Sequence, residues 1–264
     1  MNTATLERMK SGSNRLKFTA NSGGKSPVVF AGTFAGYKGH RTDSGYDQQK
    51  VSVRHFYERP KYSVETGMTL SNLNQETAGY ITGLEVYKDE SVALSNPNPE
   101  AFRDAKAARV WSRFTFGSDK SELSVTPYVR YTEMEFLQHF LPGTPLEENG
   151  QKSLGLQIYT SGNLSDIVEF YLGVDAEFTK AYLKQTQFAE TTGSAFLQAT
   201  IPTGKHYDYT VNAGQIAPFF QIRKDLTDTI SVALGSRYEE MKYDYQNRML
   251  SGRTRDDGTP CGFG

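Results

Sequence analysis

Four histidines and two acidic pairs are the residues of this sequence with the most obvious capacity for chemistry. The histidines are His40, His55, His139 and His206, and the acidic pairs are Glu147-Glu148 and Glu239-Glu240. A hydrolase needs a histidine beside a carboxylate. The residues that could supply such a pair are His139, His206, Glu147 and Asp208. Their spacing matches no catalytic motif, and the sequence contains no phosphate-binding loop, HExxH or CxxC motif. We therefore expect no catalytic residue, no metal site and no cofactor.

Aromatic and cationic residues between the apolar segments are better candidates for contacts with a ligand. There are eight candidates, two of which are histidines: Tyr80, Tyr87, Arg103, Phe136, His139, Phe140, His206 and Tyr207. Aromatic rings and guanidinium groups suit aromatic, anionic ligands such as iron chelates. Histidine is also a common ligand of metals and haem, so a metal or haem pocket in the loops remains an alternative.

Composition excludes several classes of protein. The 264 residues carry a net charge of −1, so no basic surface indicates a nucleic-acid partner. The sequence has no apolar run long enough for a transmembrane helix. Membrane β-barrels need no such run, because their strands alternate between apolar and polar residues. The 16 Tyr, 16 Phe and 24 Gly residues suit strands joined by turns.

Alternation with a period of two residues predicts ten strands. They cover residues 14–22, 27–38, 48–58, 61–72, 107–117, 121–137, 152–163, 167–185, 209–224 and 229–246. Most reach the length of about 9–11 residues that a tilted strand needs to cross a bilayer. Pro127 and Pro218 each lack a donor for the ladder and predict local bulges. Asn98-Pro99 predicts a helical turn at residues 98–102.

Each predicted strand contains a run of alternate positions that is free of charge. These runs, read at every second position, include Leu16 to Ala20, Val51 to Tyr57, Val110 to Phe116, Leu154 to Thr160 and Val168 to Phe178. None of the 44 positions in the ten runs holds Asp, Glu, Lys or Arg, although charged residues make up 22% of the chain. The opposite positions hold Arg, Glu, Asp and Gly, which suit a wet interior. Aromatic residues stand at the ends of the uncharged runs, like the girdles of membrane barrels.

The predicted connections alternate between short and long. The short ones lie at residues 23–26, 59–60, 118–120, 164–166 and 225–228, and the long ones at 39–47, 73–106, 138–151, 186–208 and after 246. Outer-membrane barrels place short turns in the periplasm and long loops outside. The pattern therefore predicts an all-β, antiparallel up-and-down transmembrane barrel segment of about ten strands, closed or as an open curved sheet. The alternatives are a soluble barrel with its apolar face inward and a ten-stranded outer-membrane hydrolase.

The second half of the chain resembles a known family. The stretch Ala217–Glu239 resembles the barrel hairpin of TonB-dependent receptors, in which an APF-x-Q strand precedes a T-x-G-x-R-Y-(D/E) strand, although Ala233 replaces the threonine. The other stretches similar to this family are Ser44–Lys50, Asn72–Gly79, Ser95–Glu100, Phe136–Pro142 and Gly252–Cys261. The resemblance covers nearly the whole chain and says little about the ligand.

The resemblance implies an outer-membrane receptor for a metal chelate such as a ferric siderophore. In this family a plug fills a barrel of about 22 strands, and TonB pulls on the plug. The sequence shows no signal peptide, plug, TonB box or closing strand, so we expect residues 1–264 to be part of a receptor barrel domain. The expected partners are outer-membrane lipid, an iron chelate, and TonB through the plug. The single Cys261 is either an incidental thiol or the partner of a cysteine beyond residue 264.

Overall fold

A computed structural model describes residues 3–8, 13–24, 26–118, 121–165, 167–252 and 254–260. Cys261 lies outside the described residues. The described strands are β1 (Thr3–Arg8), β2 (Ser13–Ser22), β3 (Val28–Tyr37), β4 (Tyr46–Arg59), β5 (Tyr62–Glu76), β6 (Phe102–Ser118), β7 (Ser121–Leu137), β8 (Leu146–Ser165), β9 (Val168–Gln187), β10 (Gly204–Thr227), β11 (Ile230–Arg237) and β12 (Glu240–Asn247). The helices are short: η1 (Val86–Lys88), α1 (Glu90–Ala93) and α2 (Ala195–Thr200).

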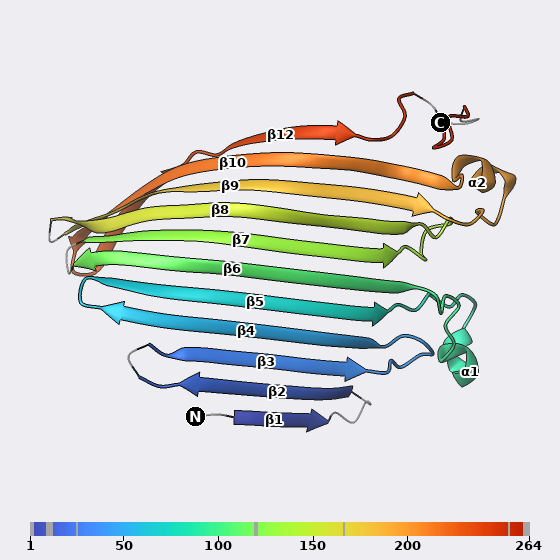
Figure 1. Cartoon of the computed structure of the whole chain (residues 1–264), viewed down its shortest axis with the longest axis horizontal. Coiled ribbons are helices and arrows are strands. Elements are labelled where there is room, and N and C mark those ends of the chain that lie inside the picture. Colours follow the sequence, from blue (N-terminus) through green and yellow to red (C-terminus); the bar gives the residue numbers. More distant parts are fainter. Residues whose placement is uncertain are drawn as a thin grey trace.

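All strands belong to one antiparallel sheet whose order follows the chain from β1 to β11, and β12 pairs with β10. Figure 1 shows the strands side by side, with the two ends of the chain at opposite edges of the sheet. Within the described part of the chain, β1 and β12 do not pair with each other, so the sheet is open. The predicted up-and-down architecture is confirmed in its open form. The strand β1 was not predicted, because six residues are too few for a clear alternation.

The alternation of short turns and long loops is confirmed. Turns such as Pro60-Lys61 and Asp228-Thr229 join strands at one end of the sheet, whereas residues 38–45, 77–101, 138–145 and 188–203 form loops at the other. Figure 1 places α1 and α2 at this loop end. The loops are shorter than predicted, because backbone pairing continues past the point where the apolar alternation stops. Where a helical turn was expected, at residues 98–102, the chain forms a single turn in which the Ala101 amide donates to the Asn98 carbonyl at 3.1 Å, and the helix α1 lies upstream.

The strand registers align the uncharged positions of neighbouring strands with one another. Leu16 pairs with Phe34, and Leu154 pairs with both Val129 and Phe178. Because the alternation within each strand does not depend on the register between strands, this agreement is an independent test of the pattern. We call the side of the sheet that carries these positions the uncharged face, and the opposite side the charged face.

The apolar side chains of the uncharged face are exposed rather than packed into a core. Leu154, Leu172 and Leu234 are 63%, 55% and 70% exposed. Among the described residues, the buried hydrophobic side chains are Ala35, Ala101, Phe136 and Ala217. A soluble barrel with its apolar face inward would bury these leucines, so the structure disfavours that alternative. No helix among the described residues is long and apolar enough to span a membrane.

The apolar residues of the uncharged face form a band that crosses the strands obliquely. Leu16 and Phe34 mark the limit of the band toward the loop end on β2 and β3, and their row of register partners reaches Tyr182 on β9. On β9 the band ends four residues closer to the turn end, at Phe178. Beyond β11 it ends at Tyr238, closer still to the turn end. With a rise of about 3.4 Å per residue and strands about 4.8 Å apart, the band slopes by roughly 20–30°. A level apolar band across tilted strands has this appearance, because barrel strands lean relative to the membrane normal.

The two prolines interrupt the ladder without a bulge, so the predicted bulges are wrong. Pro218 accepts a hydrogen bond from the Tyr238 amide at 3.0 Å but has no N–H to return one. The strand predicted at 229–246 is therefore divided into β11 and β12, which keep a single register against β10. Pairing of β6 with β7 likewise skips the positions beside Pro127 and resumes without a shift.

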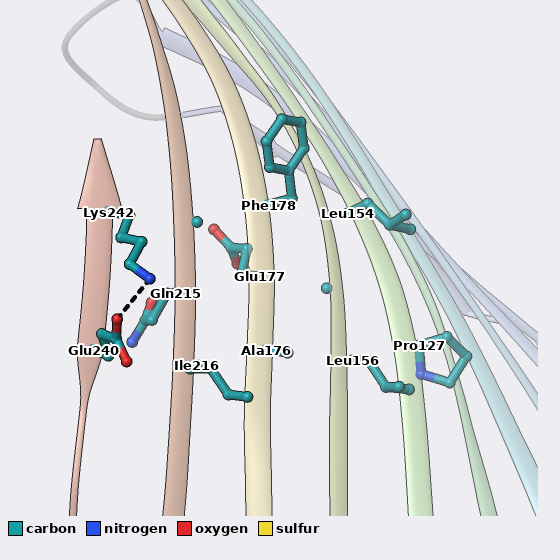
Figure 2. A pocket seen from close by; sticks show the side chains of 12 residues that line it. Pro127, Leu154, Leu156, Ala176, Glu177, Phe178, Gln215, Ile216, Glu240 and Lys242 are labelled. Carbon is teal, nitrogen blue, oxygen red and sulfur yellow. Dashed lines mark ion pairs between the residues drawn. The ribbon is translucent and has the colours of Figure 1, made fainter. Parts of the chain in front are cut away.

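Figure 2 shows a row of the band in which Pro127, Leu156, Ala176 and Ile216 lie across β7 to β10, and the row ends at the ion pair of Glu240 and Lys242 on β12. We predict that Leu156→Arg destabilises the bilayer-inserted sheet by about 2–4 kcal/mol, because it places a charge in hydrocarbon. The neighbouring Gln157→Arg lies on the charged face and is the matched control. Urea titration of the lipid-reconstituted chain measures both. Equal stability of the two variants would contradict the assignment of the faces.

Candidate functional site

Four of the eight predicted ligand-binding residues meet at the loop end of β6 and β7. Arg103 and Phe136 are register partners on the charged face, and the guanidinium carbon lies 4.3 Å from the centroid of the ring. The Phe140 ring lies 5.7 Å from that of Phe136, and the His139 ring meets it edge-on at 5.8 Å. Thr77 Oγ1 lies 3.4 Å from His139 Nδ1. We call Arg103, Phe136, His139 and Phe140 the mouth cluster.

The other four predicted residues lie outside the mouth cluster. Tyr80 and Tyr87 belong to the loop 77–101 and are 71% and 67% exposed. His206 and Tyr207 lie at the start of β10, where His206 Nε2 is 2.8 Å from the Pro202 carbonyl oxygen. Tyr207 shares a register row with Gln185 on β9, on the charged face. The structure therefore places the predicted residues in three groups at one end of the sheet.

Arg41 fastens two loops together and was not predicted as a functional residue. Its Nη1 donates to the Gly79 carbonyl at 2.5 Å and its Nε to the Ser95 carbonyl at 2.7 Å. The Thr42 amide also donates to the Leu94 carbonyl at 2.9 Å. These contacts order the loop 77–101, which carries Tyr80 and Tyr87. A single sequence gives no signal for them, because the acceptors are backbone carbonyls more than 35 residues away.

Asp89 orders the same loop locally, as the N-cap of α1. Its carboxylate accepts hydrogen bonds from the Ser91 hydroxyl and the Ser91 amide, at 2.6 and 2.9 Å. These hydrogen bonds, the one from the hydroxyl foremost, lower the pKa of Asp89. The cap satisfies a backbone donor that such a short helix would otherwise leave free.

A network of side-chain amides crosses the charged face beside the mouth cluster. Gln185 Nε2 donates to Gln138 Oε1, and Gln138 Nε2 donates to Glu147 Oε2, each at 2.7 Å. Asn149 donates to the other oxygen of Glu147 at 2.7 Å. Glu147 thus binds amides rather than a histidine, and neutral amide donors such as these can also hydrogen-bond to the oxygens of a ligand.

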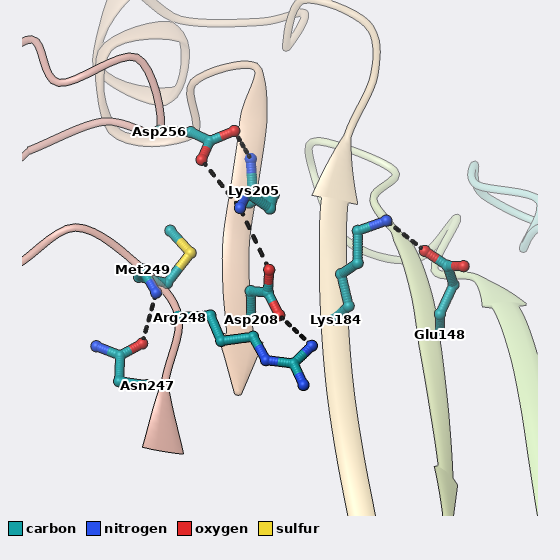
Figure 3. Close-up of polar contacts among 8 residues, drawn as sticks. All are labelled: Glu148, Lys184, Lys205, Asp208, Asn247, Arg248, Met249 and Asp256. Carbon is teal, nitrogen blue, oxygen red and sulfur yellow. Dashed lines mark hydrogen bonds and ion pairs between the residues drawn. The ribbon is translucent and has the colours of Figure 1, made fainter. Parts of the chain in front are cut away.

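The loop 248–260 is attached to the start of β10 by a cluster of charges, shown in Figure 3. Lys205 Nζ lies 3.2 Å from Asp208 Oδ2 and 3.5 Å from Asp256 Oδ1. The Lys205 amide also donates to Asp256 at 3.3 Å, and Arg248 Nη1 lies 3.9 Å from Asp208 Oδ1. We call this arrangement the loop clamp. It engages Asp208, the second carboxylate considered for a catalytic pair, with cations.

Arginines and carboxylates form a belt across the middle of the charged face. Arg54 and Arg113 both approach Glu65, at 3.5 and 3.7 Å. They also flank the Trp111 ring, with their guanidinium carbons 5.9 and 5.6 Å from its centroid. The alternation in the sequence predicts that these charges lie on the polar side of their strands. The register between strands determines which of them are close enough to pair.

The belt continues on β7, β9 and β11. The Glu177 carboxylate accepts hydrogen bonds from the Tyr128 hydroxyl and from Arg130. Farther along, Arg237 Nη1 donates to Asp175 Oδ2 at 2.6 Å. Charges of both signs are therefore paired along this face, which suits a polar lumen rather than a lipid contact.

Glycines let the large rings of the belt lie flat against the sheet. A Cβ atom built on Gly155 would meet the Tyr128 ring at 2.1 Å, and one built on Gly67 would meet the Trp111 ring at 2.4 Å. Neither glycine has a positive φ angle. The requirement for glycine is thus the close approach of the ring and not the backbone conformation.

Three of the four histidines contact a hydroxyl group or a backbone carbonyl. His139 and His206 lie beside a hydroxyl and a backbone carbonyl, and His55 Nε2 lies 2.6 Å from Ser26 Oγ at the turn end. In the described ranges, no group of three or more His, Cys, Asp or Glu residues could hold a metal ion.

Comparison with known proteins identifies the fold. No family model and no curated protein matches the sequence. The structure is similar to the unliganded ferric citrate transporter FecA, with a TM-score of 0.71, 10% identity, and coverage of 94% of this chain and 38% of that one. It is also similar to the ferripyoverdine receptor of the outer membrane of Pseudomonas aeruginosa, with a TM-score of 0.71, 10% identity, and coverage of 93% and 37%.

A third similar structure is the closed form of the ferric-catecholate import receptor Fiu from E. coli K12. Its TM-score is 0.72 at 11% identity, over 100% of this chain and 44% of that one. These observations define the class of fold as the wall of an up-and-down β-barrel. More particularly, the sheet has the fold of the barrel of TonB-dependent receptors, of which the chain spans about two fifths.

We predict that Gly155→Ala lowers the free energy of unfolding by about 1–3 kcal/mol, because the new methyl group displaces Tyr128 from Glu177. Gly214→Ala is the control, since a Cβ atom there meets nothing within 4 Å. Urea titration of the reconstituted chain measures both. A Gly155→Ala variant as stable as the Gly214→Ala variant would show that the Tyr128 ring does not need its place over the sheet.

We predict that Asp256→Asn speeds tryptic cleavage within residues 248–260, because the variant loses the ion pair with Lys205 that holds the loop. Glu148→Gln is the control, since it breaks a similar ion pair, with Lys184, away from this loop. Cleavage is followed by mass spectrometry. An unchanged rate in Asp256→Asn would mean that the loop clamp contributes nothing to holding the loop.

Proposed function

We propose that the chain forms part of the wall and the ligand-binding mouth of an outer-membrane receptor for a metal chelate, and that residues 1–264 belong to a receptor barrel domain. The observation that carries the proposal is the division of the sheet into an exposed uncharged face and a charged face with paired ions. This division suits a wall between lipid and a wet lumen. The similar structures support it, because they are receptors and transporters, two of them for a ferric chelate by name and one for ferripyoverdine.

The mouth cluster supplies the chemistry that such a ligand needs. Phe136 is almost fully buried and packs beneath Arg103, whereas Phe140 is half-exposed. A guanidinium group offers paired donors to carboxylate or catecholate oxygens, and an exposed ring offers a face for stacking. We propose that the outer loops contribute Tyr80, Tyr87, His206 and Tyr207 around this centre. In the intact receptor, TonB would act through a plug in the lumen.

The two alternatives receive less support. An outer-membrane hydrolase would need His139 or His206 beside Glu147 or Asp208, but those carboxylates bind amides and cations instead. A haem or metal receptor would need histidines facing one another, whereas His139 packs against Phe140 and His206 is beside Pro202. The names of the similar structures also describe transport and reception rather than catalysis.

We predict that Arg103→Gln weakens binding of ferric citrate or a ferric catecholate about ten-fold or more, because it removes a cationic donor from the mouth cluster. Calorimetric titration of the purified chain in detergent measures this. Arg223→Gln, at the turn end of β10, is the matched control and should bind normally. Equal affinities for the two variants, or no binding of any ferric chelate by the unaltered chain, would contradict the proposal.

A further inference from the structure

Lys152 and Lys180 are an unusual pair on the uncharged face. They are register partners on β8 and β9, and both are exposed. Like charges placed directly opposite each other on neighbouring strands are destabilising. Neither lysine forms an ion pair with a carboxylate within the described part of the chain; instead, Lys152 Nζ lies 5.7 Å from the Tyr131 ring centroid and Lys180 Nζ lies 5.9 Å from that of Phe178. An anion between the two ammonium groups would remove the repulsion.

Their position along the strands is at the edge of the apolar band. Leu154 and Phe178, each two residues from its lysine, form the last apolar row of β8 and β9 on the side of the long loops. Beyond the lysines the face becomes polar, with Glu148 paired to Lys184 at 3.0 Å. If the band lies in hydrocarbon, the two lysines lie at the height of the lipid headgroups.

A groove connects the lysines with the apolar band. It has a volume of about 370 Å³ and is lined by Lys152, Lys180, Tyr131, Val129, Leu154 and Phe178. Leu154 and Phe178 also line the adjoining groove of Figure 2, of about 630 Å³, which passes over Ala176 and Gly214. The small Ala176 side chain leaves the depression open between Leu156 and Ile216, and Gly214 leaves it open between Phe178 and Lys242. The ion pair of Glu240 and Lys242, at 2.9 Å, lines the far side of the groove. A Cβ atom on Gly214 would meet nothing within 4 Å.

We propose that this surface binds a single phosphorylated membrane lipid, with the phosphate between Lys152 and Lys180 and an acyl chain in the groove over Ala176 and Gly214. Positive charge at the headgroup end and the mainly apolar lining below it complement an anionic amphiphile. Tyr131, at the same level, has the amphipathic character of residues that line the membrane interface. The inference rests on the proposed membrane location of the uncharged face and goes beyond it, because it assigns a specific lipid site to that face.

The test is titration of the purified chain in a neutral detergent with phosphatidylglycerol, followed by native mass spectrometry. Diacylglycerol and inorganic phosphate are the comparison ligands. We expect phosphatidylglycerol to bind and the two partial ligands to bind far more weakly. Each of Lys152→Gln and Lys180→Gln should weaken lipid binding about five-fold, as expected for one lysine near a lipid phosphate. Lys184→Gln is the matched control and should bind normally, because Glu148 already neutralises Lys184 in the unaltered chain.

Gly214→Leu fills the groove without a change of charge and should also weaken binding of phosphatidylglycerol. Equal loss in Lys184→Gln and Lys180→Gln would show general attraction of the lipid to positive charge and would overturn the proposed site. Inorganic phosphate binding as tightly as the lipid would overturn the assignment to a lipid. Either failure would leave the ferric-chelate titration of the Arg103 variant unaffected, so failure of the lipid site is distinguishable from failure of the proposed receptor function.

Discussion

A charge transferred into the middle of a bilayer costs about 2–4 kcal/mol, and the pattern of this sheet follows from that cost. The apolar positions of successive strands meet along one face in register, and the arginines and carboxylates meet along the other. Because side chains alternate with a period of two, a slip of one residue in any strand would put charges into the apolar band. The same constraint therefore fixes both the register and the orientation of the wall.

The charged face shows how a wide, wet surface is kept ordered without a packed core. Trp111 and Tyr128 lie over glycines and are flanked by arginines, which are in turn paired with Glu65 and Glu177. Such rings shield the backbone ladder on the side that faces water. At the loop end, order comes instead from specific contacts: Arg41 binds one loop to another, and the loop clamp binds a loop to the start of β10. This arrangement supplies a rigid frame for the ligand-binding mouth that we propose.

The strands, their faces and the alternation of turns and loops could be predicted from the sequence, because each depends on local periodicity. The contacts between loops could not be predicted, because they join distant loops whose relative positions follow from the register. Examples are the contacts of Lys205 with Asp256 and of Arg41 with Gly79. The division of the last predicted strand had a visible cause in Pro218, whose missing donor interrupts the ladder without moving it. Of the predicted ligand-binding residues, Arg103 and Phe136 contact each other because they are register partners on the charged face. His206 was separated from His139 because the two belong to different loops.

The central claim is that the uncharged face contacts hydrocarbon and the charged face contacts water. Single spin labels along β9, introduced at residues 172–177 after replacement of Cys261 with serine, test it directly in reconstituted bilayers. The account predicts collisions with dissolved oxygen at Leu172, Val174 and Ala176, and collisions with a water-soluble nickel chelate at Gly173, Asp175 and Glu177. The reverse alternation, or uniform access to water at all six positions, would contradict it.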